Sequence, residues 1–119
     1  MKEQFESICK VELQGRIGSV RITEMLDTKV AYFTLATTFE YLMGDEYPVV
    51  ETTWHKVTAF GCTEDVDLSV LKKGAMVHVI GRIRQQKYTT QNGEERTDID
   101  IMASEVSKPR EVETYLITE

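Results

Sequence analysis

The 119-residue chain has few residues that cross-link or redirect a backbone: two cysteines, two prolines and seven glycines. Cys9 and Cys62 lie far apart and have no His or Cys cluster nearby, so neither a disulfide framework nor a metal site is expected. No apolar run reaches the roughly 18 residues of a membrane span, and the N-terminus lacks the apolar core of a signal peptide. We therefore expect a cytoplasmic protein with reduced thiols and no membrane contact.

Motifs of catalysis are also missing. The sequence has no nucleophile elbow, no phosphate-binding glycine loop and no metal-ligand cluster, and its carboxylates form no paired motif in a recognisable context. Asp98 and Asp100 are interpreted as outward residues of a strand. We therefore expect no enzymatic activity, no cofactor and no metal.

The net charge of -6 argues at first against a nucleic-acid partner, because phosphate repels acidic proteins. However, no acidic residue occurs from Leu68 to Gly93. The basic residues of that window are Lys72, Lys73, Arg82, Arg84 and Lys87. With a Debye length of about 10 Å at 0.1 M salt, carboxylates on a distant face hardly cancel this charge. The window is compatible with an anionic ligand, although a basic stretch is more often only a solvated face.

Short β-rich runs dominate the chain and predict strands at 10–17, 30–38, 52–61, 76–90 and 94–106. A short helix is predicted over 63–73, and Asn92-Gly93 predicts a type I′ hairpin turn. A loop or extended hairpin is expected through Gly44-Asp45-Glu46. This is the element order of an all-β, five-stranded OB-fold barrel with one helix between strands 3 and 4. One domain is expected at 1–106, with a short C-terminal extension at 107–119.

In the run 76–90, strand periodicity places Tyr88 on the same face as two arginines. Arg82, Arg84 and Tyr88 alternate with an apolar set that ends at Ile83 and is expected to face the core. Burying Tyr88 would also bury Arg84, which costs several kcal/mol unless the charge is paired. Tyr88 is therefore predicted to face solvent.

In the run 52–61, Trp54, Lys56 and Phe60 share one face and His55 belongs to the other. Large aromatic side chains are usually buried, so an equally weighted alternative puts Trp54 and Phe60 in the core and Lys56 at its rim. Proteins that hold unpaired bases combine exposed aromatic rings with cations that contact phosphates. The aromatic and basic residues of the two runs together favour such a surface.

Several segments resemble the bacterial single-stranded DNA-binding protein family over roughly residues 10–106. The matching segments are VELQGRIG (11–18), FTLAT (33–37), ETTWHKV (51–57), FG (60–61), LKKG (71–74), VIGRIR (79–84) and KYTTQNG (87–93). Within them, the step Trp54-His55-Lys56 is the most specific. The resemblance implies an OB-fold protein that binds single-stranded DNA without sequence preference, in DNA replication, recombination and repair.

The resemblance also implies roles for single residues. Bases are expected to stack on Trp54, Phe60, Tyr88 and, on resemblance alone, Tyr41. Phosphate contacts are implied for Lys56, Lys73, Arg84 and Lys87, and the basic strand face adds Arg82. A homotetramer is implied, with a dimer as the alternative. In it His55 lies near a subunit contact, although an ordinary barrel histidine is an equally weighted interpretation.

The family usually continues into a flexible linker and an acidic tip that recruits replication and repair proteins. Residues 115–119 do not carry such an acidic run, so the sequence leaves recruitment of these partners open. This departure supports an alternative function from another class. In that alternative, the chain is an OB-fold accessory module that acts mainly through protein contacts, such as a replication-restart primosome component.

Overall fold

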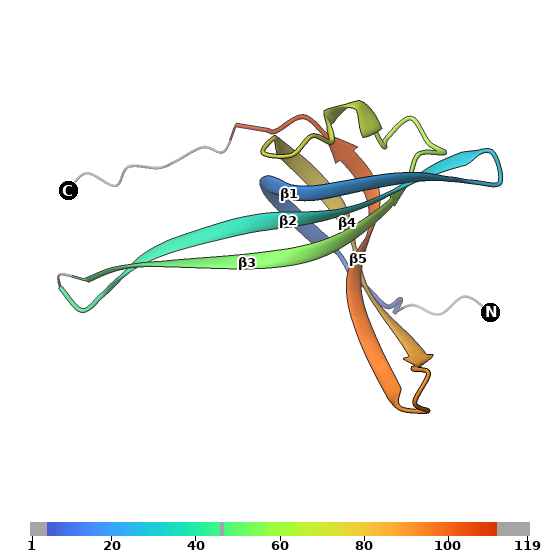
Figure 1. The fold of residues 1–119 in the computed structure, drawn as a ribbon. Coiled ribbons are helices and arrows are strands. Elements are labelled where there is room, and N and C mark those ends of the chain that lie inside the picture. Colours follow the sequence, from blue (N-terminus) through green and yellow to red (C-terminus); the bar gives the residue numbers. More distant parts are fainter. Residues whose placement is uncertain (1–4, 46, 112–119) are drawn as a thin grey trace.

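The computed structural model describes residues 5–45 and 47–111, and in it five strands close into a barrel. The strands are β1 (Val11–Met25), β2 (Thr28–Met43), β3 (Tyr47–Phe60), β4 (Met76–Thr89) and β5 (Glu95–Ser107). Their order around the barrel is β1-β2-β3-β5-β4 (Figure 1). Neighbouring strands are antiparallel except β3 and β5, which are parallel. The predicted all-β, five-stranded OB barrel is confirmed.

The barrel interior is filled by medium-sized apolar side chains from alternate strand positions. Its largest fully buried members are Leu35, Val30, Val57, Val77, Val79 and Val106. Two glycines allow the strands to approach each other closely: a Cβ on Gly15 would collide with the Ala36 carbonyl oxygen, and one on Gly81 with the Met102 carbonyl oxygen. The small interior leaves the large aromatic side chains of β3 and β4 to the outside.

Two pairs of strands continue beyond the barrel as two-stranded arms (Figure 1). β2 and β3 stay paired out to Met43 and Tyr47, which confirms an extended hairpin in this part of the chain. β4 and β5 form the second arm, and on it Ile83 is 50% exposed. The prediction that Ile83 faces the core is therefore wrong. Strand alternation continues past Gly81, but the arm has left the interior that could cover its apolar face.

Two of the hairpin turns, β4–β5 and β1–β2, differ from what the sequence predicts. At Asn92-Gly93 only the glycine has a positive φ, 81°, so the turn is not type I′. The positive-φ pair occurs instead at Leu26 and Asp27, with φ values of 49° and 67°. β1 reaches this turn because it runs on past the predicted end at residue 17, through a register shift between Ile17 and Val20.

The prediction of a helix over 63–73 is wrong, since only Leu68–Val70 form a single 3-10 turn in this segment. The residues before the turn are held by β5 instead. Val66 forms a parallel bridge with Val106, and the Asp67 N–H donates to the Val106 carbonyl oxygen at 3.0 Å. These bonds hold the backbone extended where an α-helix would need it coiled. Val66 is nevertheless buried against the core.

Within residues 5–45 and 47–111, no helix is long and apolar enough to cross a membrane. Over the same residues, no group of three or more His, Cys, Asp or Glu side chains could hold a metal ion. Cys9 and Cys62 are both free and exposed.

Candidate nucleic-acid interface

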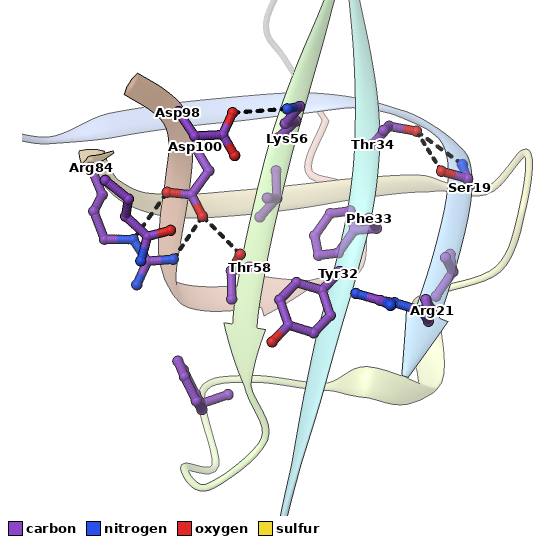
Figure 2. A pocket seen from close by; sticks show the side chains of 14 residues that line it. Ser19, Arg21, Tyr32, Phe33, Thr34, Lys56, Thr58, Arg84, Asp98 and Asp100 are labelled. Atoms are coloured by element: carbon purple, nitrogen blue, oxygen red, sulfur yellow. Dashed lines mark hydrogen bonds and ion pairs between the residues drawn. The ribbon is translucent and has the colours of Figure 1, made fainter. Parts of the chain in front are cut away.

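One outer side of the barrel gathers aromatic and charged side chains around a cavity of about 520 Å³ (Figure 2). We call this surface the outer wall. It is made of Tyr32 and Thr34 on β2, Trp54, Lys56, Thr58 and Phe60 on β3, Arg84, Gln86 and Tyr88 on β4, and Asp98 and Asp100 on β5. Side chains on one face of a strand recur at every second residue, so the residues that β3 and β4 contribute all point to the same side of the barrel.

The large aromatic residues of the outer wall are accessible. Trp54 is 60% exposed and Tyr88 is 52% exposed, while Phe60 is half-buried and lines the cavity. The alternative that places Trp54 in the core is therefore wrong. Its indole ring lies over Gly18 of β1, where a Cβ would come 2.5 Å from Trp54 Cζ3. The tryptophan is thus supported from below and open to solvent.

Two ion pairs join β5 to its neighbours on the outer wall (Figure 2). Lys56 Nζ lies 3.0 Å from Asp98 Oδ1, with both side chains well exposed. Arg84 instead forms two hydrogen bonds with Asp100: Nε donates to Oδ1 at 3.0 Å and Nη2 donates to Oδ2 at 2.7 Å. The hydrogen bond that Lys56 donates to Asp98 raises the pKa of Lys56, and the hydrogen bonds that Arg84 donates lower the pKa of Asp100.

Thr58 completes the environment of Asp100, since its hydroxyl donates to Asp100 Oδ2 at 2.8 Å. The Asp100 side chain is only 11% exposed and that of Arg84 24%. Arg84, predicted as a phosphate contact, is thus held by a carboxylate in a fixed geometry. Asp98 and Asp100 do project outward, as the sequence predicts, but both lie among the cations of the wall.

Sequence reasoning missed two residues at the cavity, Arg21 and Tyr32. The Arg21 guanidinium lies 4.8 Å from the centre of the Tyr32 ring, in a cation–π arrangement. Tyr32 could have been found, because it alternates with buried Phe33 and so belongs to the outward face of β2. Arg21 could not, since it lies beyond the register shift at which the alternation of β1 is interrupted.

The remaining predicted phosphate contacts, Arg82, Lys73 and Lys87, do not line the cavity of the outer wall. Arg82 is exposed on the strand face of Arg84, and its charge also contributes to the lowered pKa of Asp100 after the larger effects of Arg84 and Thr58. Lys73 is exposed in the loop before β4. Lys87 alternates with Tyr88 and therefore starts from the opposite face of the β4–β5 arm.

Tyr41 lies outside the outer wall, on the β2–β3 arm. Tyr41 pairs with Val49, and strand alternation puts it on the sheet face opposite that of Trp54. Its hydroxyl donates to Glu51 Oε1 at 2.9 Å. That hydrogen bond raises the pKa of Tyr41. Residues 30–55 contain four acidic residues and no Lys or Arg, so the arm offers Tyr41 no neighbouring cation for phosphates.

His55 starts from the strand face opposite Trp54 and Lys56, as predicted. Its Nε2 lies 2.8 Å from Thr37 Oγ1, and partial burial lowers the pKa of the imidazole. A half-buried histidine with a hydrogen-bond partner fits the interpretation as an ordinary barrel residue. Its place near a subunit contact stays a prediction.

Comparison with known proteins agrees with this arrangement. Residues 8–109 match the single-strand binding protein family. The single-stranded DNA-binding protein of Neisseria meningitidis serogroup A is 33% identical over 102 residues, and that of Xanthomonas axonopodis pv. citri is 36% identical over 101 residues. These alignments cover 84% and 83% of this chain, but only 59% and 56% of the respective relatives.

A solved Plasmodium falciparum SSB complex with ssDNA has the same fold, with a TM-score of 0.72 and 30% identity. The match covers 88% of this chain and 92% of the Plasmodium chain. The family match spans all five strands, including those that build the outer wall. The chain therefore belongs to the single-strand binding protein family.

Proposed function

We propose that the protein binds single-stranded DNA along the outer wall without reading its sequence, and that it catalyses no reaction. The observation that carries this proposal is the exposure of Trp54 and Tyr88 on the same wall as Lys56 and Arg84. Aromatic rings accept any base by stacking, while nearby cations contact the phosphates between bases. Family membership and the ssDNA of the Plasmodium complex support the same function.

The residue roles follow from position on the outer wall. Trp54 and Tyr88 present open ring faces for stacking, and Phe60 contributes a half-buried ring beside the cavity. The phosphate contacts are proposed at Lys56 and Arg84 within the wall. Further phosphate contacts are proposed at Arg82, Lys73 and Lys87 outside the wall, and a further stacking position at Tyr41 on the β2–β3 arm.

A titration with a dT oligomer tests this function directly, because Trp54 is the only tryptophan and reports on its own contacts. DNA binding is expected to quench its fluorescence. Affinity should fall along a straight line of log affinity against log salt, since phosphate binding releases counterions. A protein that shows neither quenching nor binding at low salt would not have this function.

Replacement of Trp54 tests the stacking role. Trp54→Ala removes the fluorophore, so binding is followed by anisotropy of a labelled dT oligomer. We expect a loss of about 1 to 3 kcal/mol, the usual contribution of one base stacked on an aromatic ring. Phe5→Ala is the control, because Phe5 is 86% exposed but lies outside the outer wall. Equal affinities of the two variants would remove Trp54 from the site.

The family match and the ssDNA of the Plasmodium complex do not favour the alternative function, an accessory module that acts through protein contacts. One observation on the β2–β3 arm is compatible with it. Phe39, Met43 and Tyr47 are all more than 60% exposed on one face of an arm that has no Lys or Arg. Acidic and apolar surface suits a protein partner better than DNA phosphate. Absence of dT binding at low salt would support this alternative.

We further propose a homotetramer, with a dimer as the alternative, that acts in DNA replication, recombination and repair in the cytoplasm. Ile83 and Ile99, which are 50% and 55% exposed, offer apolar surface for a subunit contact on the β4–β5 arm. His55 is proposed to lie near such a contact. Mass measurement of the protein with and without a dT oligomer counts the subunits and shows whether DNA changes their number.

A further inference from the structure

Asp98 has an unusual position for a carboxylate, because it lies in the middle of a surface proposed to hold phosphates. On β4, its directly opposite neighbour is the uncharged Gln86, whereas Asp100 lies directly opposite Arg84. Asp98 therefore finds its cation on another strand, at Lys56 of β3. Figure 2 shows the two side chains reaching toward each other above the cavity.

The two ion pairs of the outer wall differ in how readily they can be exchanged. Lys56 and Asp98 share one contact of 3.0 Å, and their side chains are 64% and 46% exposed. An exposed single-contact pair is weak, and a lysine ammonium on a flexible stem can turn to another anion. Arg84 and Asp100 share two hydrogen bonds in a more buried setting, where loss of either partner is costly.

We propose that Asp98 is an internal competitor of DNA phosphate for Lys56 and thereby limits the affinity of the outer wall. The proposal rests on the proposed DNA binding. A phosphate that engages Lys56 must displace Asp98 Oδ1, and the released carboxylate then faces the incoming anion. Lys56 changes partner on binding, whereas Arg84 keeps Asp100. Asp98 acts through Lys56 and through its own charge, without contacting a base.

Asp98→Asn tests this role, because the amide keeps the shape of the side chain and removes the competing charge. We expect dT binding at low salt to tighten by about threefold to tenfold, as a weak surface pair and one repulsive contact disappear. Any substitution that removes a negative charge strengthens DNA binding somewhat, because it reduces the long-range repulsion between the protein and the phosphates. Glu64→Gln measures that background, because Glu64 is exposed in the loop after β3 and lies outside the outer wall.

A double-mutant comparison separates the competition from the long-range repulsion. In a Lys56→Gln background, the affinity gained by Asp98→Asn should be no larger than that gained by Glu64→Gln, because the cation for which Asp98 competes is absent. In the wild-type background, an affinity gain of Asp98→Asn no larger than that of Glu64→Gln would overturn the proposal. An equal gain in the presence and absence of Lys56 would also overturn it. If the wild-type chain does not bind dT at low salt, the proposed function itself fails.

Discussion

The indole ring of Trp54 lies directly over Gly18, with no room for even one methyl group between them. A Cβ on Gly18 would come 2.5 Å from Trp54 Cζ3 and 2.8 Å from Thr34 Oγ1. Thr34 Oγ1 in turn accepts a hydrogen bond of 3.0 Å from the Ser19 N–H, next to the register shift of β1. A glycine on one strand thus sets the height of the exposed ring on another.

Gly18→Ala should lift the Trp54 ring from β1. The methyl group displaces the outer edge of the indole, so the fluorescence emission shifts to longer wavelength and dT affinity falls. The loss should be smaller than in Trp54→Ala, because a ring is still present. Gly61→Ala is the matched control, since its Cβ would meet Leu68 at 2.8 Å and leave Trp54 untouched. An unchanged emission spectrum in Gly18→Ala would contradict the close contact.

Tyr41 is expected to contribute less to DNA binding than Trp54. Tyr41→Ala should weaken binding to a long dT oligomer, but by less than Trp54→Ala, because its arm carries four acidic residues and no cation. Tyr41→Phe keeps the ring and loses only the hydrogen bond to Glu51, so it should bind like the wild type. A loss in Tyr41→Ala as large as that in Trp54→Ala would show that DNA follows the arm closely.

The turn between β1 and β2 is stabilised poorly by its own residues. Leu26 and Asp27 hold φ values of 49° and 67°, a conformation that side chains with a Cβ disfavour. The double replacement Leu26→Asn and Asp27→Gly gives the pair that type I′ turns prefer. We expect the free energy of unfolding to rise by about 1 to 2 kcal/mol in denaturant titrations. Leu26→Ala is the control, because it keeps the unfavourable backbone conformation and should leave the free energy of unfolding unchanged. An equal rise in Leu26→Ala would show that the effect comes from loss of the apolar side chain.

The Arg84–Asp100 pair should make stability depend on acid pH. The Arg84 hydrogen bond lowers the pKa of Asp100 below its ordinary value of 3.8, so the stabilisation is complete above that value. It is lost as pH falls through the lowered pKa of the folded protein. Asp100→Asn should cost about 1 to 3 kcal/mol at neutral pH, because a charged hydrogen-bond partner is lost, and should flatten the acid limb of the stability curve. Glu94→Gln, which alters an exposed pair, should leave that limb unchanged.

Strand alternation predicted the part of the site that depends on one strand at a time. It placed Trp54 with Lys56, and Tyr88 with Arg84, on outward faces. It could not reveal the partners of these cations, because Asp98 and Asp100 reach Lys56 and Arg84 only through the pairing of β5 with its neighbours. Resemblance supplied the binding roles, but not the ion pairs.

The predictions that the structure contradicts fail for local physical reasons. The register shift after Ile17 interrupts the alternation, so the second half of β1, with Arg21, was not recognised. Helix propensity over 63–73 was overridden by backbone bonds to Val106. The exposure of Ile83 reflects where the barrel ends, and a repeating pattern does not mark that point.

The parallel pairing of β3 with β5 involves Val57–Ala59 and Ile101–Ala103 alone, the shortest seam among the strand pairings that residues 5–45 and 47–111 form. The bonds of Thr58 to Asp100 and of Lys56 to Asp98 bridge these same two strands from outside. The side-chain bonds on the outer wall therefore help to hold β3 and β5 together where the barrel closes. Amide hydrogen exchange at this seam would register any ligand that draws Lys56 away.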